Sequence, residues 1–480
     1  MMLANLCTTG HDGVDRGIFR RYAGLSLPRH VSYPMPTWWD AMHGDDAEKM
    51  RAASDAHDPA FDYSLYVHIP FCERLCKFCA CNKIIMGRDR TPVRDQIERY
   101  LSALEQEIRH LAGSIDTTHL VRQIHWGGGS PTYLLPHEME RIQSTITDVF
   151  RVADDAEIAM EIDPRTTTEA KLGTLRGLGF NRLSMGVQDF DAKVQEHVHR
   201  IQPYEMVRDL VEAIRGHGIR SINFDLIYGM PFQTAETVRQ TVEKTLTLSP
   251  DRVAFYHYAQ IPEKIATQRG MDYTRLPDSE SKLDMFLIGM ELFEGAGYRF
   301  VGLDHFARPD ERLTQSLQNG TVQRNFQGMT TGGDLRLLGV GVSAISHLSE
   351  IGFLQNVKDI DRYLELLEDH QFPVDRGKWF TRDDLIRQAV LSELYCLCEL
   401  VPARIESRFD ICFREYFARE LGILSELETD GLVALDSDGT VRVTKPLGRV
   451  LLRNIAAVFD AYLDKEAYRK GEKASFSVNA

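Results

Sequence analysis

The chain has 480 residues, of which 43% are hydrophobic, and its 56 Lys and Arg against 70 Asp and Glu give a formal net charge of −14. This length allows one large catalytic domain with smaller additions, and the apolar content is enough for a packed core, so wholesale disorder is excluded. The net negative charge repels polyanions, which argues against general binding of nucleic acid. No apolar stretch is long enough to span a bilayer and residues 1–30 contain no signal-peptide core, so we expect a cytoplasmic protein without membrane insertion.

Short strand-like segments alternate with amphipathic helical segments from residue 64 to residue 256. The predicted strands are Ser64–Ile69, Gln123–Trp126, Glu157–Ile162, Arg182–Val187, Ser221–Ile227 and Arg252–Tyr256. The predicted helices are Pro92–Ala112, Pro136–Phe150, Thr168–Leu178, Ala192–Val198, Tyr204–His217 and Ala235–Leu248. Such alternation predicts an α/β fold with a parallel sheet and outer helices. Right-handed crossovers would curl six units into a partial (β/α)6 TIM-like barrel, with its chemistry at the carboxyl ends of the strands.

The character of the chain changes after about residue 350. Helical segments that begin near Trp379 precede a hairpin centred on Asp436–Gly439 and a closing helix. We interpret this part as a mostly helical domain that covers the barrel, since its acidic residues disfavour contact with nucleic acid. The predicted organisation is an N-terminal segment that could act as a lid (1–60), a catalytic barrel (61–350), a helical C-terminal domain with a small β-hairpin (351–464) and a flexible tail (465–480).

Four of the eight cysteines lie within ten residues, namely Cys72, Cys76, Cys79 and Cys81. Such density is typical of a metal or redox site, because a reducing compartment disfavours disulfides. The first three follow a C-x3-C-x2-C pattern, and three thiolates can bind three irons of a [4Fe–4S] cluster while the fourth iron stays open. Zinc would favour closure by a second pair of ligands, and the sequence offers no convincing one.

The segment YVHIPFCERLCKFCACNK resembles the cluster loop of radical S-adenosylmethionine (SAM) enzymes, specifically that of the oxygen-independent coproporphyrinogen III oxidase family. Other segments are similar to that family in the same order, over nearly the whole chain: PRHVSYP, HWGGGSPTY, NRLSMGVQDF, DLIYGMP, DHFARPD, RNFQGMTT and LLRNIAAVFDAYL. The resemblance implies a radical SAM oxidoreductase of haem (heme) and porphyrin biosynthesis. Such an enzyme converts two propionates of coproporphyrinogen III to vinyl groups without oxygen and so produces protoporphyrinogen IX.

The resemblance also implies which residues bind the cofactors. The metal ligands would be Cys72, Cys76 and Cys79, and SAM would chelate the open iron and be cleaved to methionine and a 5′-deoxyadenosyl radical. Members of the family bind two SAM molecules. The matching cofactor-binding positions are Tyr66, Phe78, Gly128, Gly129, Ser130, Glu161, Gln188, Arg200, Asp225, Ala259 and Ile345. Tyr66 and Cys81 are the expected catalytic residues, with Cys81 matching a non-ligand that is needed for turnover.

Local chemistry agrees with several of these assignments. The bare amides of the glycine-rich turn at 127–130 are expected to bind an anionic part of SAM. Glu161 and Asp225 could accept hydrogen bonds from ribose hydroxyls, and the planar fork of Arg200 suits a carboxylate. A tetracarboxylate substrate also needs local cations in so acidic a protein, and the candidates are Arg20, Arg21, Arg29, Arg308 and Arg324.

The expected partners are a one-electron donor of the flavodoxin or ferredoxin type and an unknown electron acceptor, and the expected state is a monomer. Two alternatives stay open. One is a radical SAM haem chaperone, which Cys81 disfavours because that branch usually has an aromatic residue there. The other is a radical SAM methyltransferase or cyclopropanase, which the match in FQGMTT disfavours. A G-x-G-x-x-A pattern at 339–344 resembles a dinucleotide fingerprint, but it lies outside a clear βαβ start.

Overall fold

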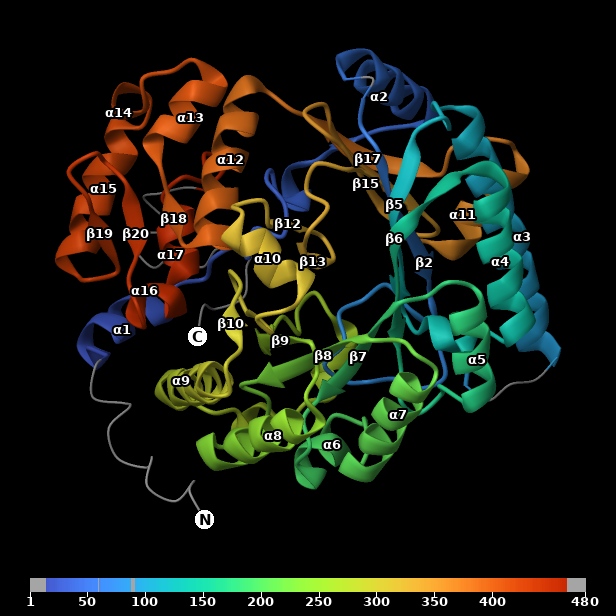
Figure 1. Cartoon of the computed structure of the whole chain (residues 1–480), viewed down its shortest axis with the longest axis horizontal. Helices are drawn as coiled ribbons and strands as arrows, with labels where there is room; N and C mark the ends of the chain where they lie inside the picture. The colour runs from blue at the N-terminus through green and yellow to red at the C-terminus, as the bar shows by residue number, and fades with distance from the viewer. Residues whose placement is uncertain (1–13, 59, 88–90, 464–480) are drawn as a thin grey trace.

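Six parallel strands form the middle of a large curved sheet, in the order β2-β5-β6-β7-β8-β9 (Figure 1). The computed structural model describes residues 14–463 apart from residue 59 and residues 88–90. The strands are β2 (Tyr63–Ile69), β5 (Leu120–Gly128), β6 (Arg151–Ile162), β7 (Arg182–Gln188), β8 (Ser221–Tyr228) and β9 (Arg252–His257). All six strands predicted from the sequence are confirmed.

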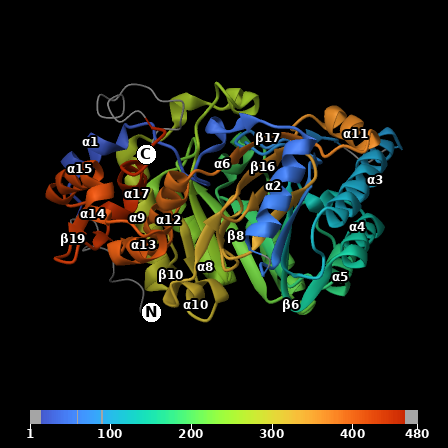
Figure 2. The same ribbon diagram turned by 90° about the horizontal axis from the view of Figure 1, so that it is seen from above.

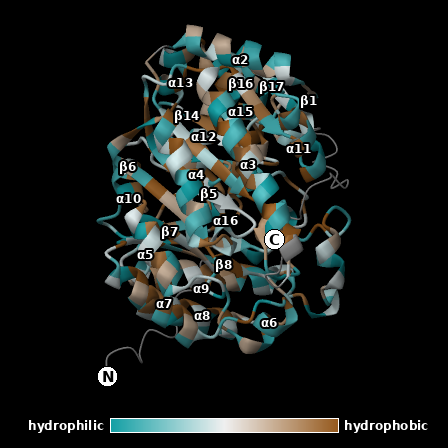
Figure 3. Ribbon diagram, turned by 90° about the vertical axis from the view of Figure 1, so that its right-hand side faces the viewer, coloured by the Kyte–Doolittle hydropathy of each residue, from teal (hydrophilic) through white to brown (hydrophobic). Residues whose placement is uncertain are grey.

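The helices that connect these strands pack on the outer side of the sheet (Figures 1 and 2). They are α3 (Thr91–Gly113), α4 (Pro136–Val149), α5 (Glu169–Gly177), α6 (Ala192–His197), α7 (Tyr204–Gly216) and α8 (Ala235–Leu248), which confirms the predicted helices. Colouring by hydropathy shows many hydrophilic residues on the outer helices, whereas the strands behind these helices are largely hydrophobic (Figure 3). This arrangement confirms the α/β fold, because both faces of a parallel sheet must be covered.

The sheet extends beyond the six units on both sides and contains thirteen strands among the described residues. Antiparallel β11 (His305–Ala307) and β10 (Arg299–Phe300) follow β9 at one edge. Beyond β2, a parallel strand precedes four antiparallel ones: β14 (Arg336–Val340), β15 (Ile345–Leu348), β16 (Gly352–Asn356), β17 (Val374–Trp379) and β1 (Asp40–Ala41). Further helices are α2 (Gly44–His57), α9 (Ser279–Gly295), α10 (Arg312–Gln318) and α11 (Ile360–Glu368). Residues 352–379 therefore contribute to the same sheet as the barrel strands.

The C-terminal part is a helical domain beside the open side of the barrel. Its helices are α12 (Arg382–Leu397), α13 (Pro402–Phe409), α14 (Phe413–Tyr416), α15 (Ala418–Thr429), α16 (Leu447–Val450) and α17 (Leu452–Ala457). A small sheet joins β18 (Glu399–Leu400), β20 (Val441–Val443) and β19 (Val433–Leu435), so the hairpin predicted at Asp436–Gly439 is confirmed. The tail predicted at 465–480 lies outside the described residues.

Two segments connect the barrel to the helical domain, one near the N-terminus and one in the middle of the chain. Helix α1 (Arg16–Ala23) contacts the C-terminal domain through the ion pair of Arg21 with Asp430, at 2.7 Å. A separate hairpin of β12 (Gln323–Asn325) and β13 (Gly328–Thr330) lies between the barrel and α12. Among the described helices, none combines the length and the apolar composition that crossing a membrane would need.

Candidate active site

The cysteine loop leaves the carboxyl end of β2 and lies between two short parallel strands, β3 (Phe71–Cys72) and β4 (Ile84–Ile85). Its cysteines are free thiols; Cys76 is buried, Cys72 and Cys79 are half-buried and Cys81 is exposed. The Cys79 amide donates to the Cys76 carbonyl oxygen at 3.2 Å, and Lys83 Nζ donates to the Cys79 carbonyl oxygen at 2.9 Å. Cys76 and Cys79 therefore share one turn, and Cys72 lies at the end of β3.

The donor set fits an iron–sulfur cluster better than a single zinc ion. Among the described residues, no three His, Cys, Asp or Glu side chains come close enough to hold one metal ion. In a [4Fe–4S] cluster each thiolate binds a different iron, so the three sulfur atoms need not converge on one ion. The other neighbouring thiols, Cys396 and Cys398, lie at the end of α12 in the C-terminal domain and supply no second pair for the loop.

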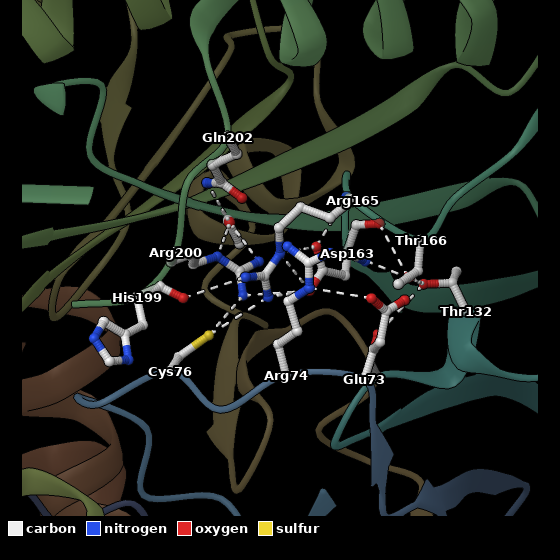
Figure 4. Close-up of polar contacts among 12 residues, drawn as sticks. Glu73, Arg74, Cys76, Thr132, Asp163, Arg165, Thr166, His199, Arg200 and Gln202 are labelled. Atoms are coloured by element: carbon white, nitrogen blue, oxygen red, sulfur yellow. Dashed lines mark hydrogen bonds and ion pairs between the residues drawn. The ribbon is translucent and has the colours of Figure 1, made fainter. Parts of the chain in front are cut away.

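Two guanidinium groups approach the sulfur of Cys76 (Figure 4). Arg200 Nη1 lies 3.4 Å and Arg165 Nη2 lies 3.5 Å from the sulfur. Asp163, just after β6, pairs with Arg165 at 2.6 Å and with Arg200 at 3.5 Å. Burial by itself would raise the pKa of Asp163, but the charges of Arg200 and Arg165 lower it to about 2. Asp163 is therefore a carboxylate beside the cysteine loop.

Tyr66 and His68 connect β2 to the cysteine loop. His68 Nε2 donates to the Asn82 carbonyl oxygen at 3.0 Å, which leaves Nδ1 to accept the Tyr66 hydroxyl at 3.0 Å. Burial lowers the pKa of His68, so the ring is neutral at pH 7. The sequence offered no ligand role for His68, and its function as a link between the tyrosine and the loop depends on the fold of residues 68–82.

The glycine-rich turn differs from our expectation that it offers free amides. The Gly129 and Ser130 amides donate to the carbonyl oxygens of Ile69 and Phe71 at 2.8 and 2.9 Å, and the Gly128 amide donates to Glu161 at 3.2 Å. An anion site built from these amides is therefore wrong. The glycines instead allow close packing, since a Cβ on Gly129 would lie 2.5 Å from the Pro70 carbonyl oxygen. A SAM contact at Gly128, Gly129 and Ser130 stays a prediction.

Glu161 and Asp225 face one polar cavity of about 220 Å³ inside the barrel. Burial would raise the pKa of Glu161, but hydrogen bonds from His125 and from the Gly128 amide lower it below its usual value. Burial, followed by repulsion from Glu161, raises the pKa of Asp225 to about 7. The barrel thus holds one ionised carboxylate and one that titrates near neutrality.

The cavity has unused hydrogen-bonding capacity that a polar ligand would satisfy. Within the described part of the chain, His125 Nδ1 and Gln327 Nε2 are buried, line the cavity and lack a hydrogen-bond partner. Buried polar atoms rarely stay unpaired in native proteins, and an amino acid, ribose or adenine group would supply partners. The residues present therefore fit SAM, and Glu161 and Asp225 are the groups that would hold it from β6 and β8.

The remaining predicted SAM residues lie at the same end of the sheet. Gln188 ends β7 with a φ of 67°, beside Arg200, whose Nε and Nη2 donate to the Gly186 carbonyl oxygen at 3.0 and 2.8 Å. Ile345 begins β15, directly after the turn that ends β14. Gln268, which the sequence did not single out, donates to the carbonyl oxygens of Ala259 and Phe78 at 2.9 and 3.1 Å. That amide joins the end of β9 to the cysteine loop.

The dinucleotide-like pattern at 339–344 has a structural role. Tyr100 donates to the His68 carbonyl oxygen at 2.7 Å, and the Gly341 amide donates to buried Glu107 at 2.7 Å. A Cβ on Gly341, whose φ is 97°, would lie 2.6 Å from the same His68 carbonyl oxygen. Gly341 therefore allows the end of β14 to pack against β2, and its amide already has a partner.

The candidate substrate arginines separate into two groups. Arg20 pairs with Glu280, Arg21 with Asp430, and Arg308 with Asp310; Arg308 lies near the amino end of β9, the opposite end from the cysteine loop. Arg29 lies at the carboxyl end of β9, where Nη2 is 3.4 Å from the His257 carbonyl oxygen. Arg324 lies on β12 and lines a cavity of about 580 Å³ between the barrel and the helical domain.

Comparison with known proteins agrees with this geometry. The model of the Radical SAM superfamily matches residues 66–245. The oxygen-independent coproporphyrinogen III oxidase of Salmonella typhimurium is 43% identical over 453 residues, which cover 94% of this chain and 96% of that protein. The Pseudomonas aeruginosa protein of the same name is 41% identical over 451 residues, with coverage of 94% and 96%. The solved coproporphyrinogen III oxidase of Escherichia coli, described as a radical SAM enzyme, gives a TM-score of 0.85 at 40% identity and covers 94% of this chain and 99% of its own.

The barrel, the three-thiol loop and these matches define a radical SAM enzyme, an oxidoreductase that uses a [4Fe–4S] cluster and SAM. Identity above 40% over nearly the full length of both chains identifies the group more narrowly. The chain belongs to the oxygen-independent coproporphyrinogen III oxidase family.

Proposed function

We propose that this chain converts coproporphyrinogen III to protoporphyrinogen IX without oxygen, by oxidative decarboxylation of two propionates. The observation that carries this function is the three-thiol loop at the carboxyl ends of the strands, above a cavity that holds Glu161 and Asp225. Near-full-length relatives with the oxidase name support it over the haem chaperone and the methyltransferase alternatives.

The protein's own contribution is binding, orientation and exclusion of water. When bound, the cluster and SAM supply the one-electron chemistry that starts removal of a hydrogen atom from the β-carbon of a propionate. Loss of CO2 and one electron then completes each vinyl group. We assign Cys72, Cys76 and Cys79 to the cluster, and the eleven SAM positions predicted from the sequence to one or two SAM molecules. Cys81 is assigned to turnover rather than to iron binding.

We also infer the surroundings in which the enzyme works. A reducing compartment keeps four neighbouring thiols free, which favours the cytoplasm. The cluster requires a one-electron donor, for which we propose a flavodoxin or ferredoxin type, and each vinyl group requires an electron acceptor that is not identified. We propose a monomer as the active state.

We propose Arg29 and Arg324 as partners of the substrate propionates. Arg29 Nη2 is 3.3 Å from Asp304 Oδ2, and Arg324 Nη1 is 3.4 Å from the Leu303 carbonyl oxygen. Arg453 of α17 donates to the carbonyl oxygens of Leu27 and Pro28 and so holds the segment that carries Arg29. Among the described carboxylates, Asp304 is the one that pairs with Arg29, and the buried Nε of Arg324 has no hydrogen-bond partner in that part of the chain, so both arginines retain donors for a carboxylate.

The decisive experiment is anaerobic reconstitution with iron and sulfide, followed by incubation with SAM, a reductant and coproporphyrinogen III. We expect protoporphyrinogen IX, with two 5′-deoxyadenosine formed per product. SAM cleavage that leaves coproporphyrinogen III intact would support the radical SAM class and contradict this substrate. Stoichiometric haem binding with no vinyl formation would instead support the chaperone.

A further inference from the structure

We propose that Arg165 raises the reduction potential of the cluster by donating a hydrogen bond to the sulfur of Cys76, and that Asp163 positions Arg165 for this contact. The inference rests on the proposed function only in that it requires the cluster on Cys72, Cys76 and Cys79. It concerns two residues to which neither the sequence patterns nor the family resemblance gave a role.

Hydrogen bonds to Asp163 hold the guanidinium group of Arg165 in one orientation. Its Nε lies 2.9 Å from Asp163 Oδ1, its Nη2 lies 2.6 Å from Asp163 Oδ2, and the Asp163 carboxylate also accepts the Arg165 amide at 2.9 Å. Both side chains are about nine-tenths buried. Because two parallel hydrogen bonds fix the guanidinium plane, Nη2 stays directed toward Cys76 Sγ at 3.5 Å (Figure 4).

Arg165 and Arg200 have different sets of partners, which separates their roles. Arg200 directs Nε and Nη2 to the Gly186 carbonyl oxygen at the end of β7 and reaches Cys76 with Nη1. It thus lies between the cysteine loop and the strand ends that carry the expected SAM residues. Among the described residues, Arg165 contacts Asp163, Cys76 and, at 3.4 Å, the His199 carbonyl oxygen, and it makes no hydrogen bond to the end of β7. We therefore assign Arg165 to the cluster and leave Arg200 for SAM.

The electrostatic consequence follows from the charges around one sulfur. Reduction adds an electron to the cluster, so a positive charge or a hydrogen bond at a ligating sulfur stabilises the reduced form and raises the potential. Burial strengthens the effect because water screens less. Asp163 acts in the opposite sense through its charge, while it orients the guanidinium. Arg165 is thus a tuning residue that need not touch substrate, and Asp163 is the residue that positions it.

The cysteine loop itself offers a matched control. Arg74 has the same charge and lies two residues from Cys76 in the sequence, but it is exposed and pairs with Glu73 at 3.1 Å. Its neutralisation removes a nearby positive charge without removing a contact to sulfur. Arg165→Gln and Arg74→Gln therefore remove the same charge. Only Arg165→Gln also removes a buried side chain that donates a hydrogen bond to the sulfur of Cys76.

The test is a redox titration of the reconstituted enzyme. The electron paramagnetic resonance signal of the reduced cluster gives its midpoint potential, and the iron content of each variant is measured as well. We expect Arg165→Gln to lower the midpoint potential by about 59 mV, a tenfold change for one electron, both with and without SAM. Arg74→Gln should stay close to the wild type. Arg165→Lys keeps the positive charge but lacks the planar fork that Asp163 holds, so it should lower the midpoint potential by less than Arg165→Gln does.

The outcomes separate this inference from the proposed function. A potential unchanged in Arg165→Gln with four irons per chain, or lowered equally in Arg74→Gln, would overturn the inference while leaving the reaction intact. Should Arg165→Gln retain fewer irons, the decision falls to Arg165→Lys with four irons per chain, and a midpoint potential equal to that of the wild type would contradict the proposal. A wild-type chain that holds a cluster but makes no protoporphyrinogen would contradict the function alone.

Discussion

Tyr66 and His68 lie two residues apart on β2 and are joined by a hydrogen bond of 3.0 Å from the tyrosine hydroxyl to Nδ1 of the imidazole. Alternate residues of a strand point to the same face, so the pair projects together toward the cysteine loop. The other ring nitrogen donates to Asn82, the residue after Cys81. One neutral imidazole therefore orients both a predicted SAM residue and the loop.

Replacing His68 with Phe should weaken SAM binding by about tenfold, because a buried hydroxyl and a carbonyl would each lose a partner worth about 1–3 kcal/mol. The measurement is the SAM dissociation constant of the reconstituted enzyme. His217→Asn is the control, since His217 lies on the outer helices and pairs with Glu169 at 2.6 Å. Equal SAM affinity in His68→Phe and wild type would contradict the link.

Cys76→Ser should not hold a complete cluster, because a serine hydroxyl is a poor replacement for a thiolate ligand. Iron and sulfide content after anaerobic reconstitution measures the effect. Cys412→Ser, in which an exposed thiol outside the loop is changed, should retain four irons per chain. A full cluster in Cys76→Ser would remove Cys76 from the ligand set.

Cys81 is exposed at the end of the loop and is predicted to act after cluster assembly. Cys81→Ser should therefore retain the iron content of the wild type and lose most formation of protoporphyrinogen. Both quantities are measured on the same preparation. Loss of iron in Cys81→Ser would instead indicate that Cys81 binds iron. Normal turnover would indicate that its thiol has no role in the reaction.

Asp225 should make the stability of the protein depend on pH. Burial and repulsion from Glu161 raise the pKa of Asp225 from 3.8 to about 7, so the folded state binds a proton that the unfolded state releases. The stability that this proton contributes is complete below about pH 4 and is lost as the pH rises through 7. At about 1.4 kcal/mol per pKa unit, the loss amounts to a few kcal/mol.

Asp225→Asn should consequently raise the Tm more at pH 8 than at pH 5, because the amide stays neutral at both values. Asn223 donates to Asp225 Oδ1 at 2.8 Å, and the variant keeps an acceptor there. Thermal unfolding by circular dichroism at the two pH values measures the difference. A Tm shift that is the same at pH 5 and pH 8 would contradict the raised pKa.

Arg29 and Arg324 should determine affinity for the tetracarboxylate substrate. Arg29→Gln and Arg324→Gln should each weaken binding by about tenfold, since a charge-assisted hydrogen bond is worth about 1.5–3 kcal/mol. Asp304→Asn should tighten binding, because the internal carboxylate that pairs with Arg29 becomes neutral. Fluorescence titration with coproporphyrin III, the stable oxidised form of the substrate, measures these changes.

Arg308→Gln is the matched control for this series, because Arg308 lies near the amino end of β9 and pairs with Asp310. Affinity that falls equally in Arg308→Gln would indicate a general effect of charge. Wild-type affinity in both Arg29→Gln and Arg324→Gln would remove these two arginines as propionate partners.

Much of the fold follows from local pattern. Each predicted strand between Ser64 and Tyr256 corresponds to a parallel strand, because a strand buried on both faces is apolar along its length. The strands beyond Arg299 were harder to predict, since β10 and β11 have only two and three residues. The cysteine loop was evident because four of the eight cysteines lie within ten residues of the chain.

The sequence by itself determined the βα order, the three-thiol loop and the family, because all three are properties of spacing and type along the chain. Only the tertiary structure decided that the amides of Gly129 and Ser130 are taken by Ile69 and Phe71, and that Arg29, not Arg308, lies at the barrel mouth. It alone placed Arg165 against Cys76, 89 residues away. Hydrogen bonds and charges act through space, so their partners depend on how distant segments pack.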